Sequence, residues 1–257
     1  MRITPLVVLT GIVSIAVAQQ QVQPPTRPSR PQDGGTREVL ESIVIPPLPN
    51  APFYTTLETD WARPMAEGGT YTLTNQRHIA RDSAGRVYEE RWLLVPKGSD
   101  VKSAMNFIQI ADPNNHTLYT CSTFKKICDL TSYQPPQPAV FEGEDSGAHP
   151  YQTKDGSQTV ENLGMKTLQG VDTVGTRQTT TIKTGVIGND RPIKIVLEYW
   201  HSQRLGFNLE SSRSDPRIGT QTFTITELDT AEPDPELFKV PEGYQVVDQQ
   251  TSPPISW

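Results

Sequence analysis

The chain has 257 residues, 35% of them hydrophobic, and carries 23 Lys and Arg against 29 Asp and Glu, a net charge of −6. This acidic balance lacks the basic footprint of a general nucleic-acid binder, so we expect no nucleic-acid partner. The length suits one domain or two small ones.

The first residues are typical of a secretory signal peptide at 1–18. Arg2 precedes the apolar run Ile3–Val17, and Ala16-Val17-Ala18 offers a small-residue cleavage site. The alternative is a membrane anchor, but this run is shorter than the about 20 residues that span a bilayer. We therefore expect an exported protein, secreted or periplasmic, without a transmembrane span in the mature chain.

The next segment, 19–36, is rich in Gln and Pro and has a single aliphatic residue, Val22. It has nothing to bury, which predicts a disordered lead that acts as a linker or, alternatively, as a partner-binding tract. Residues 37–247 are predicted to form one β-rich domain that begins with a strand or short helix at 39–45. Residues 248–257 are predicted to form a tail.

Alternating apolar and polar side chains predict a series of strands within this domain. Short turns with an aspartate at or next to their first position, such as 81–85 and 215–219, favour hairpins between consecutive strands. The predicted strands are 52–61, 70–80, 85–95, 105–111, 117–121, 170–183, 192–202, 207–213 and 222–228.

The two cysteines, Cys121 and Cys128, are separated by six residues. In an exported protein this even count and hairpin spacing predict a disulfide. Buried free thiols are one alternative. A metal site with His116 is another, but such sites usually need more ligands at close spacing, so we expect no metal.

A polar insertion is predicted at 134–163, where four prolines and several acidic residues interrupt the strands. A connection of this length is a functional flap or a disordered segment, and its low hydrophobicity favours partial disorder.

The stretch 192–202 is predicted to be the central strand of an antiparallel sheet. One of its faces is wholly apolar and the other is mixed, as expected when one side is packed and the other is partly wet. The apolar face is formed by Ile193, Ile195, Leu197 and Tyr199, which we expect to form the hydrophobic core of the fold.

The last folded piece is predicted at 231–244. Asp234 is placed to cap one helical turn with Pro235 at its first position, which turns Leu237 and Phe238 inward before Pro241 ends the turn. This piece is expected to close one end of the sheet.

An export signal, an antiparallel meander and the closing pattern Asp-Pro-x-Leu-Phe-x-Val-Pro-x-Gly-Tyr at 234–244 resemble the LolA-like superfamily of periplasmic lipoprotein carriers. Segments such as Gly175-Thr176-Arg177 and Ser214-Asp215-Pro216-Arg217 are more similar to uncharacterised secreted proteins of soil bacteria. The resemblance implies a half-barrel: a single curved antiparallel sheet with short helical plugs and an apolar concave face. It also implies a lipid, lipoprotein or envelope-protein partner. The carriers have a cavity-lining helical segment before the strands, and this chain offers only the short piece at 37–45.

No catalytic grouping stands out in the sequence. It has no Gly-x-Ser-x-Gly and no glycine-rich phosphate loop, and its four histidines are isolated from one another. We therefore expect a non-enzymatic binding protein without a cofactor, with a structural envelope module or a hydrolase with a fold-assembled site as alternatives. The candidate ligand-binding residues are Trp92, Phe107, Ile193, Ile195, Leu197, Tyr199 and Phe223.

Overall fold

A computed structural model describes residues 43–135, 151–152 and 154–250; for 151–152 it describes the backbone only. The predicted signal peptide, the Gln/Pro-rich lead and the end of the tail lie outside the described residues. Of the polar insertion, 136–150 and residue 153 also lie outside them. The described residues belong to one compact unit, Val39–Trp257.

Fourteen strands form a single sheet, and one 3-10 helix follows the thirteenth strand. The elements are β1 (Phe53–Pro64), β2 (Thr70–Arg81), β3 (Val87–Trp92), β4 (Val95–Pro96), β5 (Met105–Asp112), β6 (Thr117–Ser122), β7 (Ile127–Ser132), β8 (Tyr151–Gln152), β9 (Gly156–Leu168), β10 (Val171–Ile182), β11 (Ile193–Ser202), β12 (Phe207–Asp215), β13 (Gly219–Asp229), η1 (Pro235–Phe238) and β14 (Gln245–Asp248).

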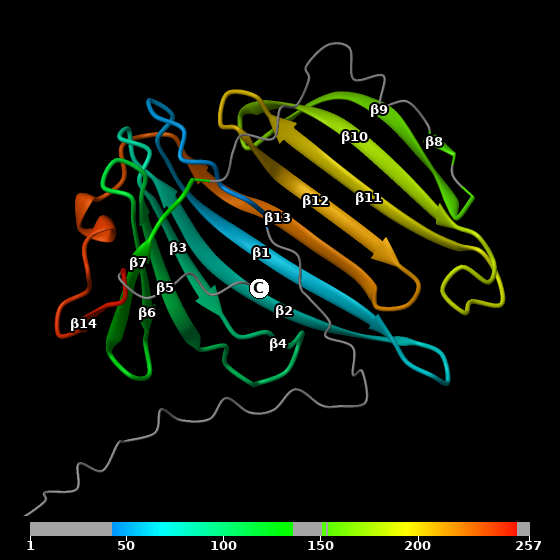
Figure 1. The fold of residues 1–257 in the computed structure, drawn as a ribbon, viewed down its shortest axis with the longest axis horizontal. Coiled ribbons are helices and arrows are strands. Elements are labelled where there is room, and N and C mark those ends of the chain that lie inside the picture. The colour runs from blue at the N-terminus through cyan, green and yellow to red at the C-terminus, as the bar shows by residue number, and fades with distance from the viewer. Residues whose placement is uncertain (1–42, 136–150, 153, 251–257) are drawn as a thin grey trace, which may run out of the picture. The chain divides into compact units, whose positions relative to one another are not determined.

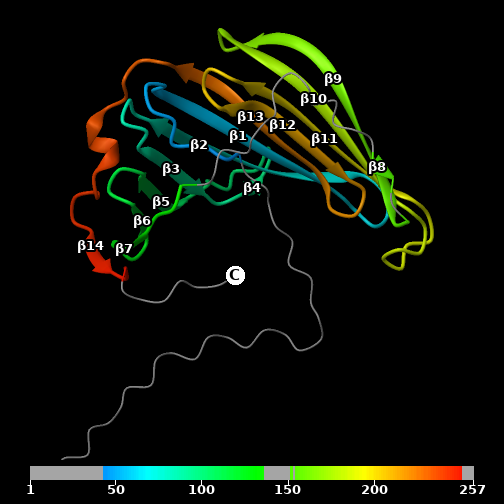
Figure 2. The same cartoon turned by 45° about the horizontal axis from the view of Figure 1, so that its top comes forward.

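The strand order is β14-β7-β6-β5-β3-β2-β1-β13-β12-β11-β10-β9-β8, with β4 paired to β2. Every pairing is antiparallel except that of β14 with β7. The sheet is strongly curled and stays open (Figure 1, Figure 2). The predicted fold class, a single curved antiparallel sheet, is thus confirmed.

One face of the sheet is concave, and the contacts across it show which face this is. Phe53 on β1 and Phe207 on β12 have ring centroids 4.8 Å apart, although β13 lies between these strands. On a flat sheet, strands two positions apart would be separated by about 9.5 Å. The sheet therefore bends toward the side that carries Phe53 and Phe207, which we call the concave face; the other side is the convex face.

The core occupies one end of the concave face, and buried Arg81 is at its centre. The Arg81 guanidinium donates hydrogen bonds to the carbonyls of Pro46, Ala51 and Leu205 at 2.7–2.9 Å. Burial lowers the pKa of Arg81 to about 10. Around it pack Ile43, Ile45, Phe53, Leu57, Ile79, Val87, Ala111, Val171, Leu205, Phe207, Leu209, Phe223 and Ile225.

The prediction that 192–202 is the central strand of the core is wrong. β11 is the fourth strand from the β8 edge, and its apolar row is only partly buried and belongs to neither buried cluster. The alternation identified the strand and its faces correctly. It could not show that the core is built on β1, β2, β12 and β13, because that depends on the curl of the sheet.

A second cluster lies on the convex face under the η1 segment. Phe238 packs there against Tyr88, Ile108, Ile110 and the disulfide of Cys121 with Cys128. Asp234 caps η1 by accepting from the Glu236 amide at 2.9 Å, as predicted. The predicted disulfide joins directly opposed residues of β6 and β7.

The structure differs from the predicted elements in several places. Residues 43–48 form neither strand nor helix. β9 begins at Gly156, inside the predicted insertion, because pairing with β10 satisfies the backbone of this polar segment. β14 at 245–248 was not predicted, since its four residues are all exposed.

Candidate functional site

The concave face continues beyond the core, and there it carries the apolar row of β11. Ile193, Ile195, Leu197 and Tyr199 occupy alternate positions of the strand and therefore point to the same face. Cross-strand pairing identifies this face: Tyr199 lies opposite Ser211, which lies opposite Phe223, which lies opposite Thr59. We call these four β11 residues the concave row.

Polar side chains border most of the concave row. On β10 the row faces Thr176, Gln178 and Thr180, and its Ile193 end faces apolar Ile182; on β12 it faces Ser211 and Arg213. The row is therefore an apolar stripe that Ile182 widens at the Ile193 end, and its four side chains are partly exposed. Its six residue steps span about 20 Å, at about 3.3 Å per residue.

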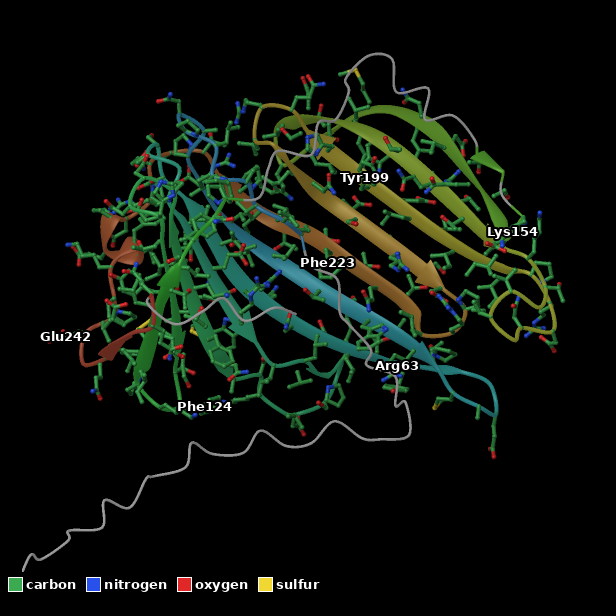
Figure 3. All side chains as sticks on the ribbon, viewed as in Figure 1. Arg63, Phe124, Lys154, Tyr199, Phe223 and Glu242 are labelled. Atoms are coloured by element: carbon green, nitrogen blue, oxygen red, sulfur yellow. A yellow bond between two sulfur atoms is a disulfide. The ribbon has the colours of Figure 1, made fainter. Side chains whose placement is uncertain are left out.

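The other predicted site residues lie in three different settings. Phe223 faces the concave side but is 4% exposed within the core, so its surface is already used by packing (Figure 3). Phe107 is partly buried on the concave face of β5, opposite Arg91. Trp92 lies on the convex face, where its indole Nε1 donates to Glu90 Oε2 at 2.7 Å.

Charged residues of β2 and β3 form a group on the concave face that sequence reasoning missed. Arg91 Nη2 lies 2.7 Å from Glu89 Oε2, and Arg77 Nη1 lies 4.0 Å from the same oxygen. Arg77 is 5% exposed, and burial followed by the nearby charge of Arg91 lowers its pKa to about 10. The sequence suggests that Glu89-Glu90-Arg91 is ordinary water-facing strand charge; the curl instead encloses Glu89.

Glu90 is also buried, on the convex face, at the centre of a polar cluster. Its carboxylate accepts from the His78 amide at 3.1 Å, the Tyr88 hydroxyl at 3.1 Å and the Trp92 indole. His78 Nδ1 lies 3.0 Å from Glu90 Oε2. Each oxygen of Glu90 already holds a neighbour in place, which is the arrangement of a structural carboxylate.

Two surface hollows lie away from the concave row. One, of about 130 Å³, is lined by Glu58, Asp60, Thr222, Thr224 and Thr226, which share the convex face. Lys97 contacts both of its carboxylates, and its hydrogen bond to Asp60 is the main reason that the pKa of Lys97 is raised. The second, of about 240 Å³, is at the strand ends around Pro64, Thr70 and Pro216.

Within the described residues, no group of three or more His, Cys, Asp or Glu side chains is placed to hold a metal ion. No helix in this part of the chain is long and apolar enough to cross a membrane.

No protein-family model and no curated protein matches the sequence. Among solved structures, an uncharacterised conserved protein from Thermus thermophilus is 10% identical, with a TM-score of 0.39 over 77% of this chain and 91% of that one. Pseudomonas aeruginosa MucB, in complex with MucA, is 15% identical, with a TM-score of 0.38 over 77% and 58%. This chain thus spans little more than half of that chain's length.

A third similar structure is a domain from Vibrio parahaemolyticus assigned to outer membrane lipoprotein sorting. It is 10% identical, with a TM-score of 0.18 over 73% of this chain and 89% of that one. At such identities and TM-scores these likenesses carry no argument about activity, and the expected similarity to secreted soil-bacterial proteins stays a prediction.

Proposed function

We propose that the protein is an exported, non-catalytic binding protein that holds an apolar chain, such as a lipid acyl chain, along the concave row. The observation that supports this is the row itself: four apolar side chains on the concave face that are left outside the core. Its length of about 20 Å exceeds the about 15 Å that one leaflet of a bilayer gives to an acyl chain.

The geometry favours a single chain over a bulky ligand. The row is one strand wide along Ile195, Leu197 and Tyr199, where its β10 partners are polar, and only its Ile193 end is widened by Ile182. Each methylene that loses contact with water contributes about 0.8 kcal/mol when fully buried, and less on an open face. Export is supported by the signal-like residues 1–18.

Displacement of a fluorescent fatty acid tests this proposal. Leu197→Asp places a charge in the middle of the concave row and should abolish binding. Val196→Asp is the matched control, because Val196 is the adjacent, partly buried residue on the convex face. Equal binding by both variants would reject the proposal. It would also be rejected if mass spectrometry finds no lipid in the purified protein and the protein displaces no fluorescent fatty acid.

A second candidate function is capture of an extended protein segment at the β9 edge. In the described residues β8 pairs only with Ser157 and Gln158, although β9 runs on to Leu168. Strand edges of this kind are used for β-strand addition. A proline at Thr159 or Glu161 should weaken such a partner's binding and leave fatty-acid binding unchanged.

A further inference from the structure

One end of the sheet gathers exposed hydrophobic side chains. Strands β1, β3, β6, β10 and β12 run in the same direction, so the turns that follow them lie at the same end. We call these turns the rim; they are 65–69, 93–104, 123–126, 183–192 and 216–218, together with 154–155 at the start of β9. Figure 1 shows them along the lower and right margins of the sheet.

Six large hydrophobic side chains on the rim are 40–66% exposed, which is half of all such residues in the described part of the chain. They are Met65, Leu93, Val101, Phe124, Val186 and Ile187. The turns at the opposite end, 82–86, 113–116 and 203–206, have no exposed large hydrophobic residue among the described ones. The coil near that end has two, Val44 and Leu48.

Three rim turns pair an exposed hydrophobic tip with an exposed cation. Val101 is followed by Lys102, and Phe124 by Lys125. Ile187 shares its turn with Arg191. The same combination therefore recurs on turns from both sides of β1 in the sheet, after β3 and β6 on one side and after β10 on the other.

The charge of the rim is positive in a chain whose net charge is −6. Lys97 and Arg217 are in salt bridges with strand carboxylates. Six more rim residues are cationic, and four are carboxylates. The cations are Lys102, Lys125, Lys126, Lys154, Lys183 and Arg191, and the carboxylates are Glu67, Asp100, Asp155 and Asp190. Phe124 and Lys154 mark two parts of the rim in Figure 3.

From this arrangement we propose that the rim docks on an anionic lipid surface, with the apolar tips in the interface and the cations against the headgroups. The tips stand on separate turns, so they do not form one contiguous patch. A protein partner needs a continuous complementary surface of about 800 Å² per side. A bilayer interface accepts each tip independently, and long cationic side chains keep their charge at headgroup level. This docking is independent of what the concave row holds.

Vesicle co-sedimentation tests the docking, with phosphatidylglycerol-containing vesicles compared with pure phosphatidylcholine. The chain from Gln19 onward is used, because the apolar run at 3–17 would itself bind lipid; circular dichroism and thermal unfolding first check that it matches the full chain. Binding should need the anionic lipid and weaken with salt. Removal of each rim lysine should weaken it about fivefold, so Lys102→Ala with Lys125→Ala should weaken it roughly 25-fold.

Matched variants separate the rim from the rest of the surface. Phe124→Ser with Ile187→Ser should also weaken binding at least tenfold. The controls are Val44→Ser with Met165→Ser, and Arg204→Ala with Lys239→Ala, all exposed residues away from the rim; these should leave binding unchanged.

Hydrogen exchange on vesicles adds a readout of orientation. Protection should appear in 93–104, 123–126 and 183–192, and not in 82–86 or 113–116. The proposal is overturned if anionic vesicles are not bound, if the control variants lose as much binding as the rim variants, or if protection appears at the opposite end.

Discussion

Tyr199 and Phe223 point to the same face of the sheet and are both paired with Ser211, yet only Phe223 is part of the core. Phe223 is 4% exposed, whereas Tyr199 is partly exposed (Figure 3). The border between the filled and the open part of the concave face therefore runs between two strands, β13 and β11, that are separated by β12. The proposal that the concave row binds a ligand depends on this border, because only the residues outside the core are open to a ligand.

Affinity for fatty acids should rise with chain length until the chain is about as long as the concave row. Each added methylene on a half-open face should contribute about 0.4–0.8 kcal/mol, a two- to fourfold gain. Beyond about 20 Å the affinity should level off, because no further apolar residue of the row is available. Isothermal titration with a series of saturated fatty acids measures this. Affinity that does not change with chain length would contradict a binding site along the row.

Arg81→Met should destabilise the protein by about 3 kcal/mol or more. The methionine fills part of the space but leaves three carbonyls, of Pro46, Ala51 and Leu205, without their donor, at about 1–3 kcal/mol each. Urea unfolding measures the change. Arg204→Met, at an exposed arginine in the β11–β12 turn, is the control and should have little effect. Equal stability of both variants would show that Arg81 does not hold the coil and turn in place.

Asp215→Asn should lower stability at neutral pH and flatten its loss in acid. Asp215 accepts from the Arg217 amide, Nε and Nη2 at 2.6–3.0 Å, and the Arg217 side chain is the main cause of the lowered pKa of this carboxyl. Because the folded-state pKa lies below the unfolded value of about 3.9, the stabilisation is complete above that value and is lost as pH falls through the folded one. Thermal unfolding between pH 2 and 7 measures it; parallel curves for the two proteins would contradict this role.

Replacement of both cysteines, Cys121→Ser with Cys128→Ser, should cost about 2–3 kcal/mol, the chain-entropy value for so short a loop. The sulfurs are also buried beneath Phe238, so η1 should loosen as well. Guanidinium unfolding measures the loss. The unchanged protein treated with a reductant should have the same free energy of unfolding as the variant. If the two differ, the variant's loss of stability comes from the serine side chains and not from the missing disulfide.

Local patterns predicted much of this fold because they depend on neighbours in sequence. The strands, their hairpins, the Asp234 cap and the cysteine pair all follow from alternation, turn residues and spacing. The core location depended on contacts such as Phe53 with Phe207 across an intervening strand, which no local pattern encodes.

Only part of the candidate site could be predicted, because local patterns show which residues of a strand share a face but not how the sheet curls. The four residues of the concave row share a face, as their alternation indicated, but the assignment of Trp92 to the concave face does not hold. Trp92 is two residues after Glu90 on β3 and so shares its face, and the indole bonds to Glu90 on the convex side. Arg77 and Arg81 were missed because arginine is mostly exposed, and only the curl buries them.

Photo-crosslinking of a diazirine fatty acid, followed by peptide mapping, tests the central claim most directly. Labels should concentrate on 193–199 and on the facing residues of β10 and β12, and excess unlabelled fatty acid should remove them. Labels confined to the convex face, or spread evenly over the chain and insensitive to competition, would contradict the proposed site.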